Sequence, residues 1–310
     1  MAIDSAQDPA AITVDLDNLW SYLRSAGKSD WNDYASFFAL ALPRLLDFLD
    51  QNELPATLFI VGRDARDDPN SKLLGGRDSI SIQSHSFEHS ERFDQFSLDE
   101  LHQDIEQTEA AIGELSGSKP VGFRSPSFMV SSDLMNCLVE RSYQYDSSTF
   151  RTVTGPLARW YSARISDRQN SRPKPSATAH GRVGEAFGDL RPHRLAEPHS
   201  DLIEIPVTTH PILRMPIHGT YLNFLGDRST RLAKRYVRSG LNACRKRGVP
   251  LVYLLHLTDF IGADDEIAPK FLPGMRRTHQ QKTALLQNVI SAAISEFEFK
   301  KIDEIAAGVS

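Results

Sequence analysis

The amino-acid sequence predicts a mostly parallel α/β fold, and two observations support this prediction. Short apolar runs rich in β-branched residues alternate along the chain with longer segments of helical periodicity. Ionisable residues follow several of these runs, at the positions where parallel strands would end. The chain has 310 residues, 40% of them hydrophobic and 24% charged, which is an ordinary globular composition. We expect one domain over residues 1–310.

Seven segments are candidate strands, and helical patterns lie between them. The strands are expected at residues 11–14, 56–61, 79–82, 121–123, 143–145, 202–207 and 250–255. The helices are expected at residues 34–49, 97–115, 131–141 and 282–296. Ser97 and Glu100 have the spacing of a capping box, and Pro43 predicts a kink in the first helix. Residues 154–200 lack periodicity, so we expect a long irregular excursion there.

Ionisable side chains follow five of the predicted strands. They are Asp15, Asp17, His85, Arg124, Asp146 and His256. The carboxyl ends of parallel strands meet at one edge of the sheet or barrel, where active sites form. One such residue would mean little, because Asp and His often cap strand exits. Their repetition predicts a single shared site.

The spacing of two histidines and two aspartates indicates a metal site. His85 and His89 are four residues apart, so on a helical turn they would share one face and could hold an ion. A pair of surface or capping histidines would have the same spacing. Asp17 would complete a set of two imidazoles and one carboxylate, which leaves positions open for water and substrate. In an extended segment Asp15 points the same way as Asp17 and could accept a proton, although the pair could also simply cap a turn.

These motifs, taken in order, resemble the polysaccharide deacetylase family, also called carbohydrate esterase family 4. The resemblance runs from about Ile12 to Leu257 and is weaker beyond. It rests on residues 13–17, 56–62, 85–89, 123–128, 145–148 and 254–256. It implies a distorted (β/α) barrel of about seven strands, with fewer than eight complete units. Leu16 separates two aspartates that are adjacent in the commonest family form, so the chain resembles a D-x-D subgroup that includes lipid-linked aminoarabinose deformylases.

The resemblance also implies a ligand set and a general base. The metal ligands would be Asp17, His85 and His89. The metal would be divalent, with Zn²⁺ expected first and Co²⁺, Fe²⁺, Mn²⁺ or Ni²⁺ as alternatives. Asp15 would be the general base, paired with Arg124 so that it stays ionised.

The remaining implied roles concern the leaving group and the oxyanion. His256 would be the general acid that protonates the leaving amine, and Asp146 would hydrogen-bond to His256. A backbone N–H near Phe128 would help to stabilise the oxyanion. The implied reaction is removal of an acetyl or formyl group from an amino sugar in a glycan, a lipid-linked sugar or a sugar precursor.

Charge and terminal sequence limit the partners. A net charge of −5 and a pI near 6.1 argue against a nucleic-acid binder. The N-terminal residues lack a basic and apolar signal sequence, and no apolar run reaches the ~18 residues of a membrane span, so we expect a cytoplasmic protein. Eight basic residues between Arg228 and Arg247 would form a solvated helix face, or would contact anionic lipid head groups or a lipid-linked sugar phosphate. Nothing in the sequence predicts the oligomeric state.

Two other classes of protein match part of the sequence. Residues 12–19 resemble the first motif of haloacid dehalogenase-type phosphatases, in which Asp15 would be the nucleophile and Asp17 the acid/base. Residues 264–265 would supply a late acidic motif, but the histidines and Arg124 would have no role. The second class is a non-catalytic carbohydrate-binding member of the deacetylase family. The presence of both a base and an acid argues against it.

Overall fold

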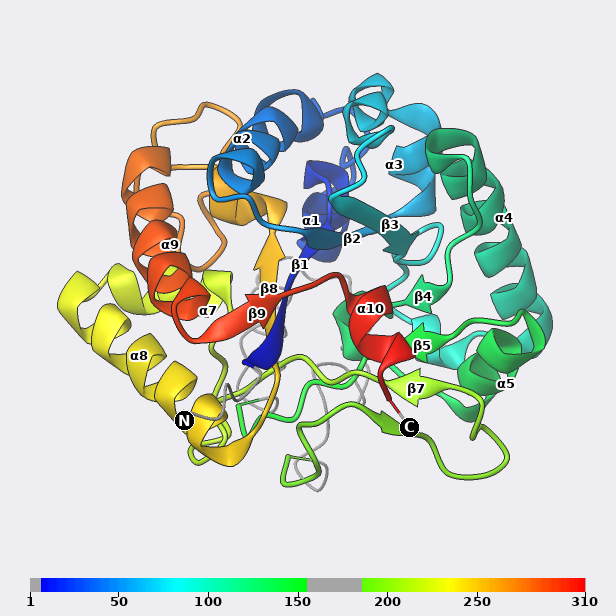
Figure 1. Cartoon of the computed structure of the whole chain (residues 1–310). Coiled ribbons are helices and arrows are strands. Elements are labelled where there is room, and N and C mark those ends of the chain that lie inside the picture. The colour runs from blue at the N-terminus through cyan, green and yellow to red at the C-terminus, as the bar shows by residue number, and fades with distance from the viewer. Residues whose placement is uncertain (1–6, 155–185, 310) are drawn as a thin grey trace.

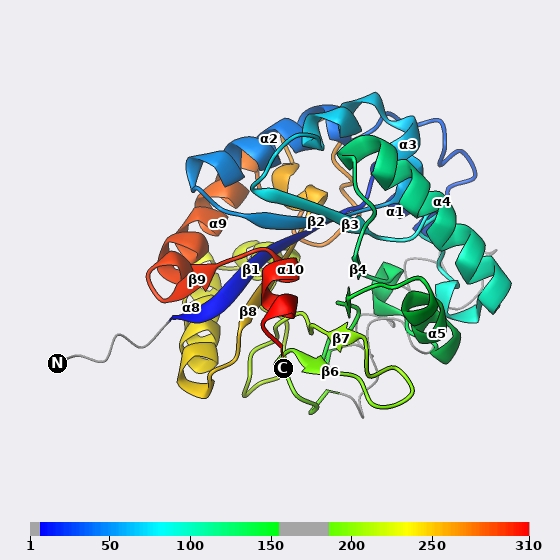
Figure 2. The same ribbon diagram turned by 45° about the vertical axis from the view of Figure 1, so that its right-hand side comes forward.

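We describe residues 7–154 and 186–309 of the chain, from a computed structural model (Figures 1 and 2). The strands are β1 (Asp8–Leu16), β2 (Ala56–Ile60), β3 (Ile80–Ser84), β4 (Gly122–Phe123), β5 (Tyr145–Asp146), β6 (His193–Arg194), β7 (Ile203–Glu204), β8 (Leu251–His256) and β9 (Phe297–Phe299). They form one sheet in the order β6-β7-β5-β4-β3-β2-β1-β8, with β9 pairing with the start of β1. Each pair is parallel except β6 with β7.

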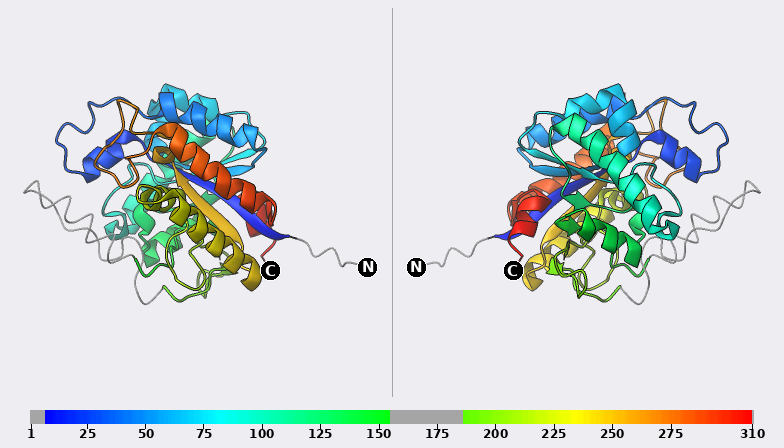
Figure 3. Two further views of the ribbon diagram at one scale, coloured as in Figure 1. Left: turned by 90° about the vertical axis from the view of Figure 1, so that its left-hand side faces the viewer. Right: turned by 90° about the vertical axis from the view of Figure 1, so that its right-hand side faces the viewer.

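Helices cover the outer face of the curled sheet. The α-helices are α1 (Leu19–Ser25), α2 (Phe38–Gln51), α3 (Gly62–Asp67), α4 (Leu98–Ser116), α5 (Ser132–Glu140), α7 (Gly219–Gly226), α8 (Thr230–Arg247), α9 (His279–Ile294) and α10 (Ile302–Ala307). Short 3-10 turns lie at Pro69–Leu74, Phe93–Gln95, Pro126–Phe128 and Leu257–Phe260. Figure 3 shows α8 beside α9 on one side of the molecule and α4 on the other. No helix in residues 7–154 or 186–309 has the length and apolar character needed to cross a bilayer.

Alternation along β1 separates the outer core from the barrel interior. Ile12, Val14 and Leu16 are fully buried within the large cluster that includes residues of α2, α8 and α9. Ala11 packs with an inner cluster to which α10 contributes Ile302 and other apolar residues. The helix therefore closes the amino end of the barrel, and the polar residues of β1 face the interior above it.

The barrel is completed by a short segment after β7. The N–H of Thr208 donates to the carbonyl of Val252 in β8 at 3.1 Å, and its Oγ1 donates to the carbonyl of Pro250 at 2.9 Å. These bonds join the segment after β7 to β8 and so close the barrel without a full ladder of strand hydrogen bonds. The curled sheet is thus the distorted barrel that the family resemblance implied.

The fold class and the seven strands expected from the sequence are confirmed. The missed strands are β6, which is two residues long and antiparallel, and β9, which pairs only with the first residues of β1. The capping box of Ser97 and Glu100 is formed, and α2 continues through Pro43. Residues 155–185 of the expected excursion lie outside the described residues, while 186–200 contain β6. The single-domain interpretation stays a prediction.

Gly122 provides a test of this packing. A Cβ atom at Gly122 would lie 2.0 Å from Cζ of Tyr145, whose ring is fully buried and whose hydroxyl donates to Asp303 at 3.1 Å. We expect Gly122→Ala to destabilise the protein by about 3 kcal/mol, because the buried ring cannot move without breaking that bond. Gly113→Ala is the control, since its Cβ would meet no atom within 4 Å. Urea unfolding of both variants measures the difference, and equal midpoints would contradict the described packing.

Candidate metal centre

Strand register brings the distant site residues together at the carboxyl end of the barrel. Asp15 of β1 is level with His256 of β8 and, across β2, with Gln83 of β3. Asp17 and His85 each lie two residues further along the chain, so they share a second layer on the same inward face. The D-x-D spacing therefore directs both aspartates into the barrel, in successive layers.

Asp17, His85 and His89 form a cluster of buried ligand atoms. All three atoms lie within 4.8 Å of one another, with Oδ1 of Asp17 at 3.3 Å from Nε2 of His85 and 3.2 Å from Nε2 of His89. Despite these distances, Oδ1 of Asp17 is buried without a hydrogen bond of acceptable geometry. Among the described residues, no Lys or Arg pairs with Asp17, so its buried charge lacks a full counter-charge. This donor set fits a divalent cation.

The two histidines are held in different ways. Nδ1 of His85 lies 2.7 Å from the carbonyl oxygen of Arg124 and donates to it, which leaves the lone pair of Nε2 for a metal. Nδ1 of His89 is buried and, within the part of the chain described, has no hydrogen-bond partner. The expected helical turn is wrong, because Ser86 and His89 have φ of 60° and 45° and the segment is a loop.

Asp104 of α4 holds the inner part of this loop. Its carboxylate accepts from the N–H of Phe87 at 2.9 Å and from that of Glu88 at 3.4 Å. Burial raises the pKa of Asp104 to about 7, although these two bonds oppose the shift. The backbone position of this loop thus depends on α4, a helix that lies outside every motif identified in the sequence.

Asp15 is paired within a fully buried network. Oδ1 of Asp15 accepts from Nη1 of Arg124 at 2.7 Å, and the same nitrogen donates to Oγ1 of Thr13 at 3.1 Å. Arg124 also donates to the carbonyl and the hydroxyl of Ser147. Because Oδ1 is engaged, Oδ2 is the oxygen that remains to accept a proton.

His256 faces Asp15 but does not contact Asp146. Nε2 of His256 lies 3.9 Å from Oδ2 of Asp15, and its side chain is 19% exposed. The partner of Nδ1 is Oγ1 of Thr220 at 3.2 Å. The expected Asp146–His256 hydrogen bond is therefore wrong, and Thr220 at the start of α7 takes that position.

Asp146 instead belongs to a buried carboxyl pair. Its Oδ1 accepts from Ser148 at 2.5 Å, and Oγ of Ser148 accepts from the N–H of Ser125 at 2.8 Å. Burial raises the pKa of Asp146 to about 6, while burial and then the charge of Asp146 raise the pKa of Glu204 well above its usual value. Asp146 thus anchors the 125–128 turn through Ser148.

The turn at residues 125–128 lies where the sequence predicts an oxyanion contact, and that contact stays a prediction. The N–H of Phe128 donates to the carbonyl of Ser125 at 3.1 Å, so it is already used within the turn. The Phe128 ring stacks on Phe150 with centroids 5.0 Å apart, Phe150 meets His218 at 5.7 Å, and His218 lies 6.1 Å from His256. Sequence reasoning missed Phe150, which lies beside His218, because no spacing marks it.

Asp64 of α3 lies behind the first aspartate motif and gives a prediction for pH. Its Oδ1 accepts from Nδ2 of Asn18 and from Nε1 of Trp20, both at 2.9 Å. Burial raises the pKa of Asp64 to about 7. Below that pH the folded protein keeps the proton on Asp64. The stability that this protonated carboxyl contributes is therefore complete below about pH 4 and is lost as the pH rises to 7.

The loss is on the order of 4 kcal/mol, since each pKa unit corresponds to about 1.4 kcal/mol. We expect Asp64→Asn to lose less stability than the wild type between pH 5 and pH 8. Urea unfolding at both pH values measures this difference in stability. Asp67→Asn is the control, because the side chain of Asp67 is half-exposed. Equal pH slopes for the wild type and Asp64→Asn would refute this assignment.

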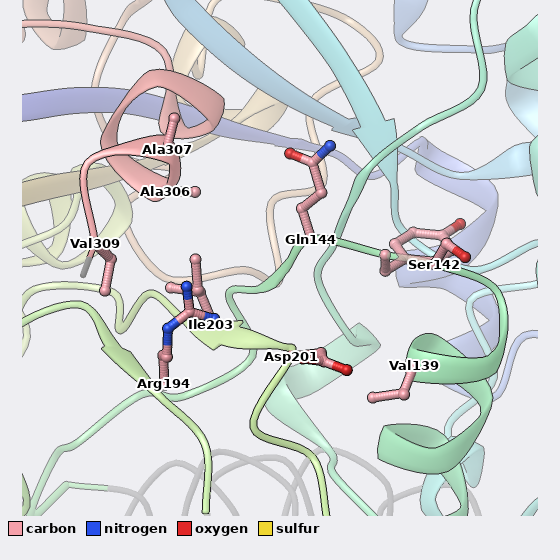
Figure 4. Close-up of a pocket in the computed structure, with 10 residues that line it drawn as sticks. Val139, Ser142, Gln144, Arg194, Asp201, Ile203, Ala306, Ala307 and Val309 are labelled. Carbon is pink, nitrogen blue, oxygen red and sulfur yellow. The ribbon is translucent and has the colours of Figure 1, made fainter.

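A separate cavity lies at the opposite end of the barrel. Its volume is about 410 Å³, and Figure 4 shows Gln144 and Ile203 facing Ala306 and Ala307 of α10 across it. None of the residues that line it belongs to the metal-ligand cluster. We therefore assign no role in the site to this cavity.

Comparison with known proteins gives a family match over part of the chain, and the fold. The family model for polysaccharide deacetylase matches residues 33–146, which include His85, His89, Arg124 and Asp146 but not Asp17 or His256. No curated protein matches the sequence.

Similar solved structures span nearly the whole chain. A polysaccharide deacetylase homologue from Mycobacterium smegmatis has a TM-score of 0.65 at 20% identity, covering 100% of this chain and 92% of its own. Puue allantoinase has a TM-score of 0.60 at 14% identity, covering 98% and 91%. A polysaccharide deacetylase homologue from Pseudomonas aeruginosa PAO1 has a TM-score of 0.59 at 15% identity, covering 96% and 89%.

These structures share the fold and carry names of more than one activity, so the fold alone does not define the reaction. The sequence match includes four of the site residues, and the barrel has the family's architecture. The chain is therefore similar to the polysaccharide deacetylase family over residues 33–146 and has the fold of the solved structures compared.

Proposed function

We propose that this protein is a metal-dependent hydrolase that removes an N-acyl group, acetyl or formyl, from an amino sugar. The carrying observation is the convergence of Asp17, His85 and His89 within 4.8 Å, one layer beyond the facing pair of Asp15 and His256. Metal ligands, a base and an acid within one buried space are what amide hydrolysis requires.

The three ligands would hold one divalent cation. Two imidazole nitrogens and one carboxylate suit Zn²⁺ best, with Co²⁺, Fe²⁺, Mn²⁺ and Ni²⁺ as alternatives. When bound, the metal would polarise the amide carbonyl. The unbonded, buried Oδ1 of Asp17 supports this assignment.

The proton transfers fall to Asp15 and His256. Oδ2 of Asp15 would accept a proton from water as the water oxygen bonds to the acyl carbon, while Arg124 holds Oδ1. Nε2 of His256 would give its proton to the sugar nitrogen as the C–N bond breaks. Thr220 can accept from the N–H of Nδ1, so it would orient the ring of His256 with Nε2 toward the site. The products are a carboxylate and a free amino sugar.

The phosphatase alternative has less support. Asp265, part of its late acidic motif, is paired with Arg44 at 2.7 Å, and Asp264 accepts from the N–H of His279. Oδ1 of Asp15, the nucleophile in that mechanism, is bound by Arg124. A non-catalytic role is disfavoured because acid and base face each other at 3.9 Å.

The test is release of acetate or formate from N-acylated amino sugars by the purified protein. The panel includes free sugars, a glycan oligomer and a polyprenyl-phosphate sugar. The last is included because α8 carries seven basic residues and Arg228 lies just before it. We expect activity on one class, loss with a chelator, and recovery with Zn²⁺ or Co²⁺. Activity that a chelator leaves unchanged would contradict the proposal.

A further inference from the structure

The helix α1 follows the Asp17 motif directly and reaches both parts of the ligand cluster. It begins two residues after Asp17 and lies beyond the end to which β1 points (Figure 3). Oη of Tyr22 donates to Oδ2 of Asp17 at 3.2 Å. Because this bond engages Oδ2, Oδ1 is the oxygen that faces the two imidazoles.

Arg24, on the same helix, holds the loop that carries the second histidine. Its Nη2 donates to the carbonyl oxygen of Glu88 and to that of His89, the latter at 2.6 Å. His89 has a φ of 45°, a left-handed conformation that non-glycine residues adopt only when their surroundings impose it. Asp104 does not reach it, since its bonds end at Glu88.

The need for this contact follows from the difference between the histidines. The ring of His85 is oriented by the carbonyl of Arg124, whereas Nδ1 of His89 has no hydrogen-bond partner within residues 7–154 and 186–309. Its position therefore depends on its backbone. In that described part of the chain, the backbone bonds of His89 are to Ser86 and Arg24, and only Arg24 lies outside the loop.

The guanidinium of Arg24 is itself held by aromatic rings. It lies 4.8 Å from the ring centroid of Trp20 and 5.5 Å from that of Trp31. Arg63 makes nearly the same contacts, at 4.9 and 5.2 Å, and both arginines lie 3.7 Å from Glu88. Arg63 differs in one respect, because its side chain donates to Asn32 and not to the carbonyls of the loop.

We propose that α1 is a clamp in which Arg24 and Tyr22 are positioning residues that fix His89 relative to Asp17 and so control how long a bound metal stays. The inference rests on the proposed metal site. It assigns the retention of the metal to a helix outside the motifs, through two backbone carbonyls that accept from one nitrogen of a ring-stacked guanidinium.

The experiment measures dissociation of Co²⁺ from the loaded full-length protein into excess chelator, followed by the visible spectrum of the cobalt site. We expect Arg24→Ala to release the metal about 10- to 100-fold faster than the wild type. Arg63→Ala is the matched control, with the same rings and the same Glu88, and should stay within about twofold. Tyr22→Phe should accelerate release less than Arg24→Ala, because Asp17 keeps its backbone position.

Four outcomes would overturn the inference. The first is release of Co²⁺ from Arg24→Ala at the wild-type rate. The second is release from Arg63→Ala at the rate of Arg24→Ala, which would assign the effect to the aromatic cluster. If Arg24→Ala does not fold, Arg24→Met, which keeps the apolar stem and removes the donor, replaces it, and a wild-type release rate there counts equally against the clamp. A wild-type protein that never binds Co²⁺ overturns the proposed function as well, so the two failures are distinguishable.

Discussion

His85→Ala should leave the protein folded but without its metal. The ring of His85 is 2% exposed, donates through Nδ1 to a backbone carbonyl, and directs Nε2 at Asp17. Two ligands would remain, one of which is His89, whose Nδ1 has no hydrogen-bond partner among the described residues. We expect the metal content to fall from about one per chain to below about one tenth, and hydrolysis to fall by at least about 10³-fold.

Metal analysis after gel filtration measures this effect directly, independently of any substrate. His102→Ala is the control, because that imidazole is 30% exposed and bonds to Glu140 away from the cluster. Full metal occupancy in His85→Ala would show that the ligand assignment is wrong. Full occupancy with lost activity would point instead to a role for His85 in proton transfer.

Asp15→Asn and His256→Ala should keep the metal and lose the chemistry. Asparagine still accepts from Arg124 through its carbonyl oxygen, so the buried network remains paired, but it cannot take a proton from water. Alanine at 256 removes the proton donor beside Oδ2 of Asp15. We expect kcat to fall about 10²- to 10⁴-fold in each variant with the metal content unchanged.

The pH–rate profiles separate the two roles. Loss of the base should flatten the acidic limb of the profile, and loss of the acid should flatten the alkaline limb. Thr220→Val, which removes the partner of His256, should alter the alkaline limb alone. Identical profiles for Asp15→Asn and His256→Ala would contradict the assignment of base and acid. A phosphorylated enzyme trapped in the wild type would support the phosphatase alternative.

Much of the fold was predictable because its determinants are local. Each of the seven expected strands contains apolar or β-branched residues, which favour a buried strand whatever their distant partners are. Ser97 caps α4 together with Glu100, three positions away. β6 and β9 were missed for the same reason. They are two and three residues long, and only their neighbours in space make them strands.

The sequence by itself determined which side chains are at the strand ends, since alternation along β1 directs Asp15 and Asp17 to one face whatever surrounds them. Tertiary structure decided which partners they meet. Asp146 pairs with Ser148 and Glu204 while Thr220 reaches His256, because loop lengths and strand register set these distances. The loop form of residues 85–89 likewise depends on Asp104, which accepts from the backbone of this loop, and on Arg24, which donates to it. No local sequence pattern connects either residue with the loop.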